Sequence, residues 1–143
     1  MNVIRLIFYF GILFFCVACR NSMSLNEVFN KTLQMERFEI VERPVGGFPE
    51  SFGTVTTCAH PNSSLREDII ELLSNLPEEW LAFEISDERL IYRIYISPND
   101  SVDNVLVVLV GQGGGDTMMS LFSATDMQGV KQFVSQLNEE YKQ

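Results

Sequence analysis

The chain has 143 residues, of which 46% are hydrophobic, and a formal net charge of −9. This length and hydrophobic content predict one globular domain and argue against an intrinsically disordered chain. The acidic balance is not offset by any cluster of Lys or Arg. It therefore argues against nucleic-acid binding and against a body that lies flat on anionic lipid.

The first 18 residues are typical of a cleaved leader. Arg5 supplies one positive charge, and a strongly apolar run follows from Leu6 to Phe15. Even when it is continued to Ala18, this run is too short to cross a ~30 Å hydrocarbon core as a helix. It matches a signal peptide and not a permanent membrane span.

The end of the leader, Cys16-Val17-Ala18-Cys19, resembles the bacterial lipobox. The resemblance implies that Cys19 receives a diacylglycerol and becomes the N-terminus after cleavage. Cys16 departs from the pattern, because an aliphatic residue usually stands there. We predict a signal peptide at 1–18, a lipidated Cys19 with a short tether at 19–23, and a single domain at 24–143. An ordinary secretory signal that is cut nearby is the alternative.

The predicted anchor places the protein in the cell envelope, because lipid chains of this kind attach a protein stably to a membrane. Surface-exposed lipoproteins of the Bacteroidetes usually carry acidic residues directly after the lipidated cysteine. Residues 20–23 contain none. We therefore expect a location on the periplasmic side of the outer membrane.

Cysteine usage limits the covalent chemistry of the mature chain. Of the three cysteines, Cys16 leaves with the leader and Cys19 carries lipid, so Cys58 alone remains as a thiol. No intramolecular disulfide is predicted.

Three helices are predicted in the domain. Ser24 and Glu27 form a capping box, and the apolar spacing that follows predicts a helix from about residue 25 to 36. A second capping box begins at Ser64, and its apolar stripe ends at Pro77. A closing helix begins after a cap at one of two residues, Thr125 or Asp126.

Alternating apolar residues predict strands between the second and third helices. A hairpin is expected from the two alternating segments that begin at Leu81 and Leu90. Residues 105–110 are continuously apolar, as in a strand buried on both faces, and residues 117–123 form a fourth strand. Before these strands, residues 38–41 are compatible with a short strand, and residues 44–61 are interpreted mostly as a loop. The prediction is an α+β fold in which a four-stranded antiparallel β-meander is packed by three α-helices.

This order of elements resembles a family of small Bacteroidetes lipoproteins classed as domain of unknown function 4252. The resemblance covers most of the mature chain and is strongest from Leu65 onward. It rests on the strands Leu90–Ile96, Val105–Val110 and Thr117–Phe122, the turns between them and the helix that follows. In that family a glycine is common after the last strand, where this chain has Ala124. The resemblance implies a lipid-anchored envelope protein and brings no activity with it.

The most conspicuous motif is the glycine-rich string at residues 111–116. A phosphate-binding loop needs a helix N-terminus after the glycines, so that backbone N–H groups face the anion. Here a strand follows, and no Lys-Ser or Lys-Thr pair is present. We interpret the string as a hairpin loop.

Cys58 and His60 form the one place where a thiol and an imidazole are close in sequence. Such a pair can support nucleophilic chemistry, but only an extended backbone would put both on one side. No further Cys or His exists to complete a zinc site, so no metal and no cofactor is predicted. A partly buried free cysteine beside a loop histidine is the simpler interpretation.

Adjacent carboxylates such as Glu78-Glu79 and Asp87-Glu88 fall in turns. Glycosidase chemistry needs two carboxylates that face each other across a cleft, and neighbouring turn residues are usually solvated. No catalytic set is predicted from them.

The second face of the predicted sheet carries the strongest functional signal. It contains Ile91, Arg93 and Tyr95, a mixture typical of protein interfaces. The alternative is that the first helix and a loop containing Phe48 and Phe52 cover this face.

These observations predict a lipid-anchored envelope protein that acts as a non-enzymatic binding or accessory module. Its expected partners are the membrane, through the lipid, and an envelope protein. One alternative is a thiol-dependent enzyme or redox sensor that uses Cys58. The other is a small structural homo-oligomer, and the oligomeric state itself is left open.

Overall fold

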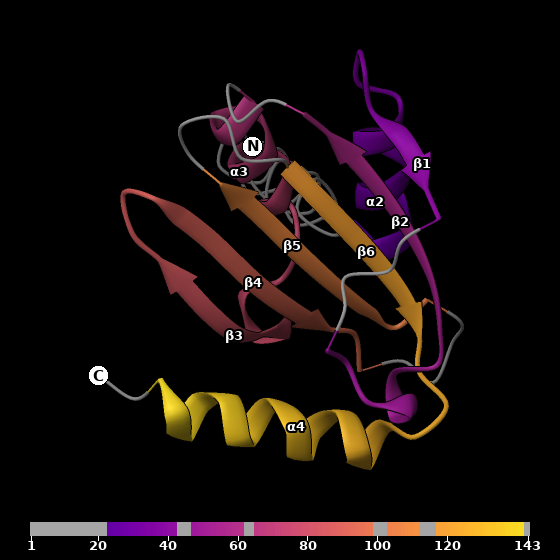
Figure 1. Ribbon diagram of the computed structural model, residues 1–143, viewed down its shortest axis with the longest axis vertical. Helices are drawn as coiled ribbons and strands as arrows, with labels where there is room; N and C mark the ends of the chain where they lie inside the picture. The colour runs from indigo at the N-terminus through magenta and orange to yellow at the C-terminus, as the bar shows by residue number, and fades with distance from the viewer. Residues whose placement is uncertain (1–22, 43–46, 62–64, 99–102, 112–116, 142–143) are drawn as a thin grey trace, which may run out of the picture.

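A computed structural model describes residues 23–42, 47–61, 65–98, 103–111 and 117–141 (Figure 1). The predicted leader, Cys19 and most of the glycine-rich string lie outside these residues. The described chain is α+β, with three α-helices and one six-stranded antiparallel sheet. The helices are α2 (Leu25–Leu33), α3 (Arg66–Leu73) and α4 (Met127–Glu140).

Helix α2 begins where the capping box predicts. The Ser24 side chain accepts a hydrogen bond from the Glu27 backbone N–H at 3.1 Å. The helix ends at Leu33, three residues before the predicted Glu36. The chain then reverses through Arg37, whose φ of 71° is left-handed.

The other two helices follow in the predicted order. Helix α3 begins at Arg66, and Leu65 occupies the N-cap position without a side-chain hydrogen bond. Ser64, the predicted cap, lies outside the described residues. Helix α4 takes its cap from Asp126, whose carboxylate accepts from the Gly129 N–H at 3.2 Å.

The predicted meander is present. Its strands β3 (Leu81–Ser86), β4 (Leu90–Ile96), β5 (Val105–Gly111) and β6 (Thr117–Ser123) pair antiparallel with their neighbours in sequence.

The sheet has six strands and not four, which corrects the prediction. Strand β2 (Thr54–His60) runs through the segment interpreted as a loop and pairs along its whole length with β6. Strand β1 (Glu39–Val41) then pairs with β2, so the strand order is β1-β2-β6-β5-β4-β3. The β-branched run of Thr54, Val55, Thr56 and Thr57 favours a strand. The Gly and Pro residues before it concealed this signal.

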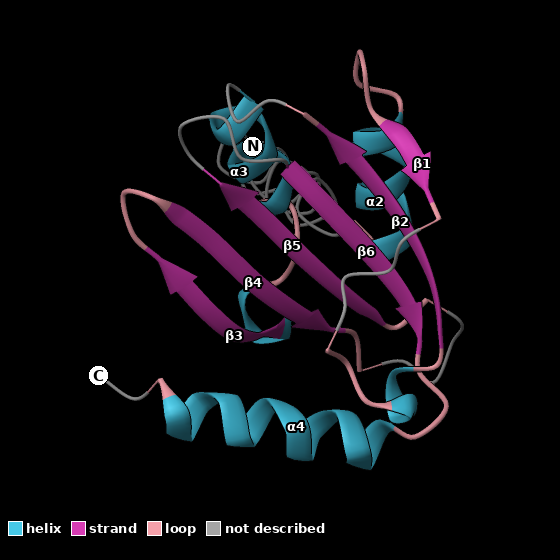
Figure 2. Ribbon diagram, in the orientation of Figure 1, coloured by secondary structure: helices cyan, strands magenta, loops and turns pink. Residues whose placement is uncertain are grey.

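Both faces of the sheet are covered, each by a different set of helices (Figure 2). On the α2/α3 face, side chains from both helices pack with strand residues such as Ile91, Leu106 and Met119. On the α4 face, Val130 and Val134 of α4 pack with Phe52, Phe83 and other residues. Phe52 belongs to η1 (Glu50–Phe52), whose Ser51 carbonyl accepts the N–H groups of Thr125 and Asp126 before α4. These contacts explain why the middle strands are apolar on both sides.

Within the described residues, no helix combines the length and the apolar content that a bilayer crossing requires.

Candidate functional site

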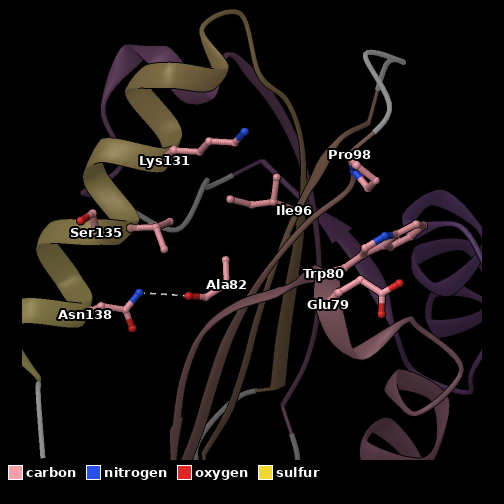
Figure 3. A pocket seen from close by; sticks show the side chains of 9 residues that line it. Glu79, Trp80, Ala82, Ile96, Pro98, Lys131, Ser135 and Asn138 are labelled. Atoms are coloured by element: carbon pink, nitrogen blue, oxygen red, sulfur yellow. Dashed lines mark hydrogen bonds between the residues drawn. The ribbon is translucent and has the colours of Figure 1, made fainter.

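A cavity of about 460 Å³ lies where α4 meets the end of the sheet at β3 and β4 (Figure 3). Three separate parts of the chain form it: the turn before β3, the adjoining ends of β3 and β4, and one side of α4. Its described lining residues are Glu79, Trp80, Ala82, Ile96, Pro98, Lys131, Val134, Ser135 and Asn138.

Helix α4 supplies the polar side of the cavity. Lys131, Ser135 and Asn138 are spaced by four and three residues, so they share one helical face. Val134 on the same helix is buried and contributes to the apolar core beneath. Figure 3 shows the Lys131 side chain running from α4 toward the strand end that carries Ile96 and Pro98.

The opposite wall comes from η3 (Glu78–Trp80), the short 3₁₀ turn that follows Pro77. The Trp80 N–H donates to the Pro77 carbonyl at 3.1 Å, which closes the turn. Trp80 is half-buried and belongs to the lining residues. Its indole is turned away from α4 (Figure 3), and it packs against the cluster on the α2/α3 face. Glu79 is exposed, and its carboxylate is turned away from α4 (Figure 3).

A β-bulge fixes the distance between α4 and the sheet. The register of β3 against β4 shifts between Leu81 and Phe83, which leaves Ala82 without a partner on β4. The Asn138 side-chain amide donates to the Ala82 carbonyl at 3.0 Å. The helix therefore supplies a hydrogen bond to the carbonyl of the bulge residue.

The lining combines apolar and polar side chains. Aromatic and aliphatic groups with a few polar side chains are typical of ligand pockets. Among the described lining residues there is no histidine, cysteine or aspartate to activate the Ser135 hydroxyl. Elsewhere in the described ranges, no group of three His, Cys, Asp or Glu side chains is placed to hold a metal ion.

Cys58 and His60 lie together, but in the core and away from this cavity. Because β2 is a strand and not a loop, both side chains point to the α2/α3 face. Cys58 is 0% exposed and His60 is 4% exposed, and the His60 ring packs against Phe38. Burial raises the pKa of the Cys58 thiol from 9.0 to about 12. The thiol is therefore protonated and shielded at neutral pH, which argues against a nucleophilic role.

The predicted partner face is not available to a partner. Ile91 and Tyr95 are only 1% and 4% exposed, because side chains of α2 and α3 pack in the same cluster. Arg93 is half-buried, with its Nε 2.5 Å from Glu84 Oε2 and its Nη1 3.2 Å from the Tyr95 hydroxyl. The first helix covers this face, as the alternative proposed, whereas Phe48 and Phe52 belong to the α4 face.

Part of the sheet surface on the α4 face is less deeply buried than Ile91 and Tyr95 on the α2/α3 face. A cross-strand row there is half-buried in the structure, and its members are Ala59, Met118, Leu109, Tyr92 and Ile85. The neighbouring row is fully buried, with members Thr57, Ser120, Val107, Ile94 and Phe83. Thr57 and Ser120 satisfy each other through a buried 2.8 Å hydrogen bond between their hydroxyls.

Sequence reasoning missed the cavity entirely. Its residues come from three elements that are far apart in the chain, and no spacing rule connects Trp80 with Lys131. The one usable signal was the stripe of Lys131, Ser135 and Asn138 beside the apolar face of the last helix.

Comparison with known proteins gives no match for this chain: no family model, no curated protein and no solved structure is similar to it at a significant level.

Proposed function

We propose that this protein is a lipid-anchored, non-enzymatic binding module of the bacterial cell envelope. In this proposal, a small ligand enters the cavity between α4 and the β3–β4 end of the sheet. The observation that carries the proposal is the cavity itself, whose volume of about 460 Å³ lies in the range of small-molecule sites.

The envelope location in this proposal rests on the sequence. Lipidation at Cys19 and the likeness to the lipoprotein family named above both support it. The outer membrane, with the body facing the periplasm, is the proposed site. An acidic domain suits a tethered position, because anionic lipid repels it.

The alternative with Cys58 as a reactive group has less support. A reactive thiol needs to be exposed and deprotonated, and Cys58 is neither at neutral pH.

Trp80 provides a direct test, because it is the one tryptophan of the chain and it lines the cavity. The protein is titrated with octan-1-ol, octanoate and octylamine, three probes that share an eight-carbon chain and differ in head group. We expect at least one probe to change the Trp80 emission in a saturable manner. A Ser135→Phe variant, which fills the mouth of the cavity, should lose this response.

Gln136→Phe is the matched control, because Gln136 is exposed on the same helix and does not line the cavity. It should retain the response. If no probe gives a saturable change, or if Ser135→Phe and Gln136→Phe behave alike, the proposed function is wrong.

A further inference from the structure

We propose that the cavity is selective for a small monocarboxylate with an apolar body, and that the Lys131 ammonium receives the carboxylate. This inference rests on the proposed function and specifies the chemistry of the ligand. Three features of the cavity carry it: its charge, its hydrogen-bonding groups and its apolar lining residues.

Lys131 is the one basic residue among the described residues that line the cavity. It is exposed, and no carboxylate or carbonyl in the described part of the chain pairs with it. Its side chain runs from α4 toward the strand end that carries Ile96 and Pro98 (Figure 3). A cation without a partner beside an apolar surface attracts an anionic head group.

The acidic residue of the lining does not neutralise this lysine. Glu79 belongs to the opposite wall, is exposed, and directs its carboxylate away from α4 (Figure 3). A zwitterionic or cationic ligand would need a carboxylate directed into the cavity. The geometry therefore favours an anion over a cation.

Ser135 adds a hydroxyl one helical turn from Lys131 and makes no hydrogen bond of its own in the described structure. Asn138 is already engaged, because its amide donates to the Ala82 carbonyl. One ammonium and one hydroxyl match the two oxygens of a carboxylate.

A phosphate or another multiply charged anion fits less well. The site offers a single cation, and the chain as a whole carries a net charge of −9. The surrounding negative field penalises each additional charge on the ligand. A singly charged head group is the form that one lysine can compensate.

The remaining lining is apolar and sets the nature of the ligand body. Five of the lining residues are apolar: Trp80, Ala82, Ile96, Pro98 and Val134. Burial of a hydrocarbon chain or ring on these groups supplies binding free energy in proportion to its apolar area.

The same three eight-carbon probes test the inference. Octanoate should bind more tightly than octan-1-ol, and octylamine should bind most weakly. Lys131→Gln keeps most of the side-chain stem and removes the charge. We expect it to weaken octanoate binding about threefold to fivefold, the upper part of the range of an exposed ion pair, and to leave octan-1-ol binding unchanged.

Two variants complete the design. Lys131→Arg keeps the charge and should bind octanoate within about twofold of the original protein. Lys31→Gln removes an exposed lysine on α2, against the other face of the sheet, and should have no effect.

The outcomes separate this inference from the proposed function. If octan-1-ol binds as well as octanoate, or if Lys131→Gln behaves like Lys31→Gln, the cavity binds apolar molecules but the carboxylate assignment is wrong. Tightest binding of octylamine would overturn it in favour of a cationic ligand. No saturable binding of any probe would overturn both proposals.

Discussion

At the scale of single residues, burial decides the chemistry of Cys58. The side chain is surrounded by apolar groups on the α2/α3 face, and this desolvation holds the pKa of the thiol at about 12. The nearby imidazole of His60 does not offset it. Cys58 is therefore a core residue, although a histidine stands two positions after it in the sequence.

We predict that iodoacetamide does not label Cys58 in the native protein at pH 8 and labels it after denaturation. The test uses a chain that begins at Met23, in which Cys58 is the one cysteine. Thr56 is exposed on the same strand, so a Thr56→Cys, Cys58→Ala variant should react readily and serves as the control. Fast labelling of native Cys58 would restore the thiol hypothesis.

The same pKa shift predicts a loss of stability at alkaline pH. The folded state holds the Cys58 proton more tightly than the unfolded state, whose thiol has a pKa near 9.0. The stabilisation is therefore complete below pH 9 and declines as the pH rises toward about 12. Denaturant unfolding of the same chain and of its Cys58→Ala variant should show a steeper alkaline decline for the chain with the thiol.

Gly53 is a position where the backbone requires glycine. Its φ is +74°, and a Cβ there would lie 2.0 Å from the Ser123 carbonyl oxygen of β6. We predict that Gly53→Ala lowers the free energy of unfolding by about 3 kcal/mol, because backbone strain and steric overlap add.

Gly47→Ala is the control for Gly53→Ala. Gly47 also has a positive φ, of +96°, but a Cβ there would meet nothing within 4 Å. It should cost about 1 kcal/mol, the conformational part alone. Equal effects of the two variants, measured by urea denaturation, would show that the contact with Ser123 does not matter.

At the scale of elements, one side-chain hydrogen bond adds to the apolar packing of α4 against the edge strand β3. Asn138 satisfies the carbonyl of the bulge residue Ala82, which has no partner on β4. The bulge and the helix therefore stabilise each other. Both residues line the cavity.

We predict that Asn138→Ala destabilises the protein by about 1 kcal/mol, the usual net value of one hydrogen bond. Faster amide exchange in the last turns of α4 should accompany the loss. Gln136→Ala changes an exposed neighbour on the same helix and should have little effect. If the two variants have equal stability, the hydrogen bond does not hold the helix in place.

Elements with a strong local period were predicted correctly, and β2 was not. Four strands and three helices follow from alternation, helical spacing and caps, which depend on neighbouring residues. Strand β2 instead depends on its partner β6, and the paired residues Thr57 and Ser120 are 63 positions apart. Glycines and prolines near β2 made a loop the better local interpretation.

At the scale of the whole molecule, the proposed anchor and the folded domain have separate roles. The domain is acidic. In the proposal, the lipid at Cys19 supplies the attachment to the membrane.

We predict that Cys19→Ala moves the protein from the membrane fraction to the soluble periplasmic fraction when intact cells are fractionated. The lipid alone would supply the membrane affinity in this case. Cys16→Leu restores the aliphatic residue that is usual at this position of the lipobox, and it should leave the protein in the membrane. Membrane retention of Cys19→Ala would mean that the leader is wrongly interpreted or that another anchor exists.

The sequence by itself determined the class of fold, and it carries the predictions of a leader and of no local catalytic motif. It did so because charge, apolar run length and residue spacing are properties of the chain alone. Only the tertiary structure decided which faces are covered. Ile91 and Tyr95 were candidates for a partner face or for a covered one, and α2 and α3 bury them. The cavity also exists only in three dimensions, because packing brings Trp80 and Lys131, from separate elements, into the lining of one space.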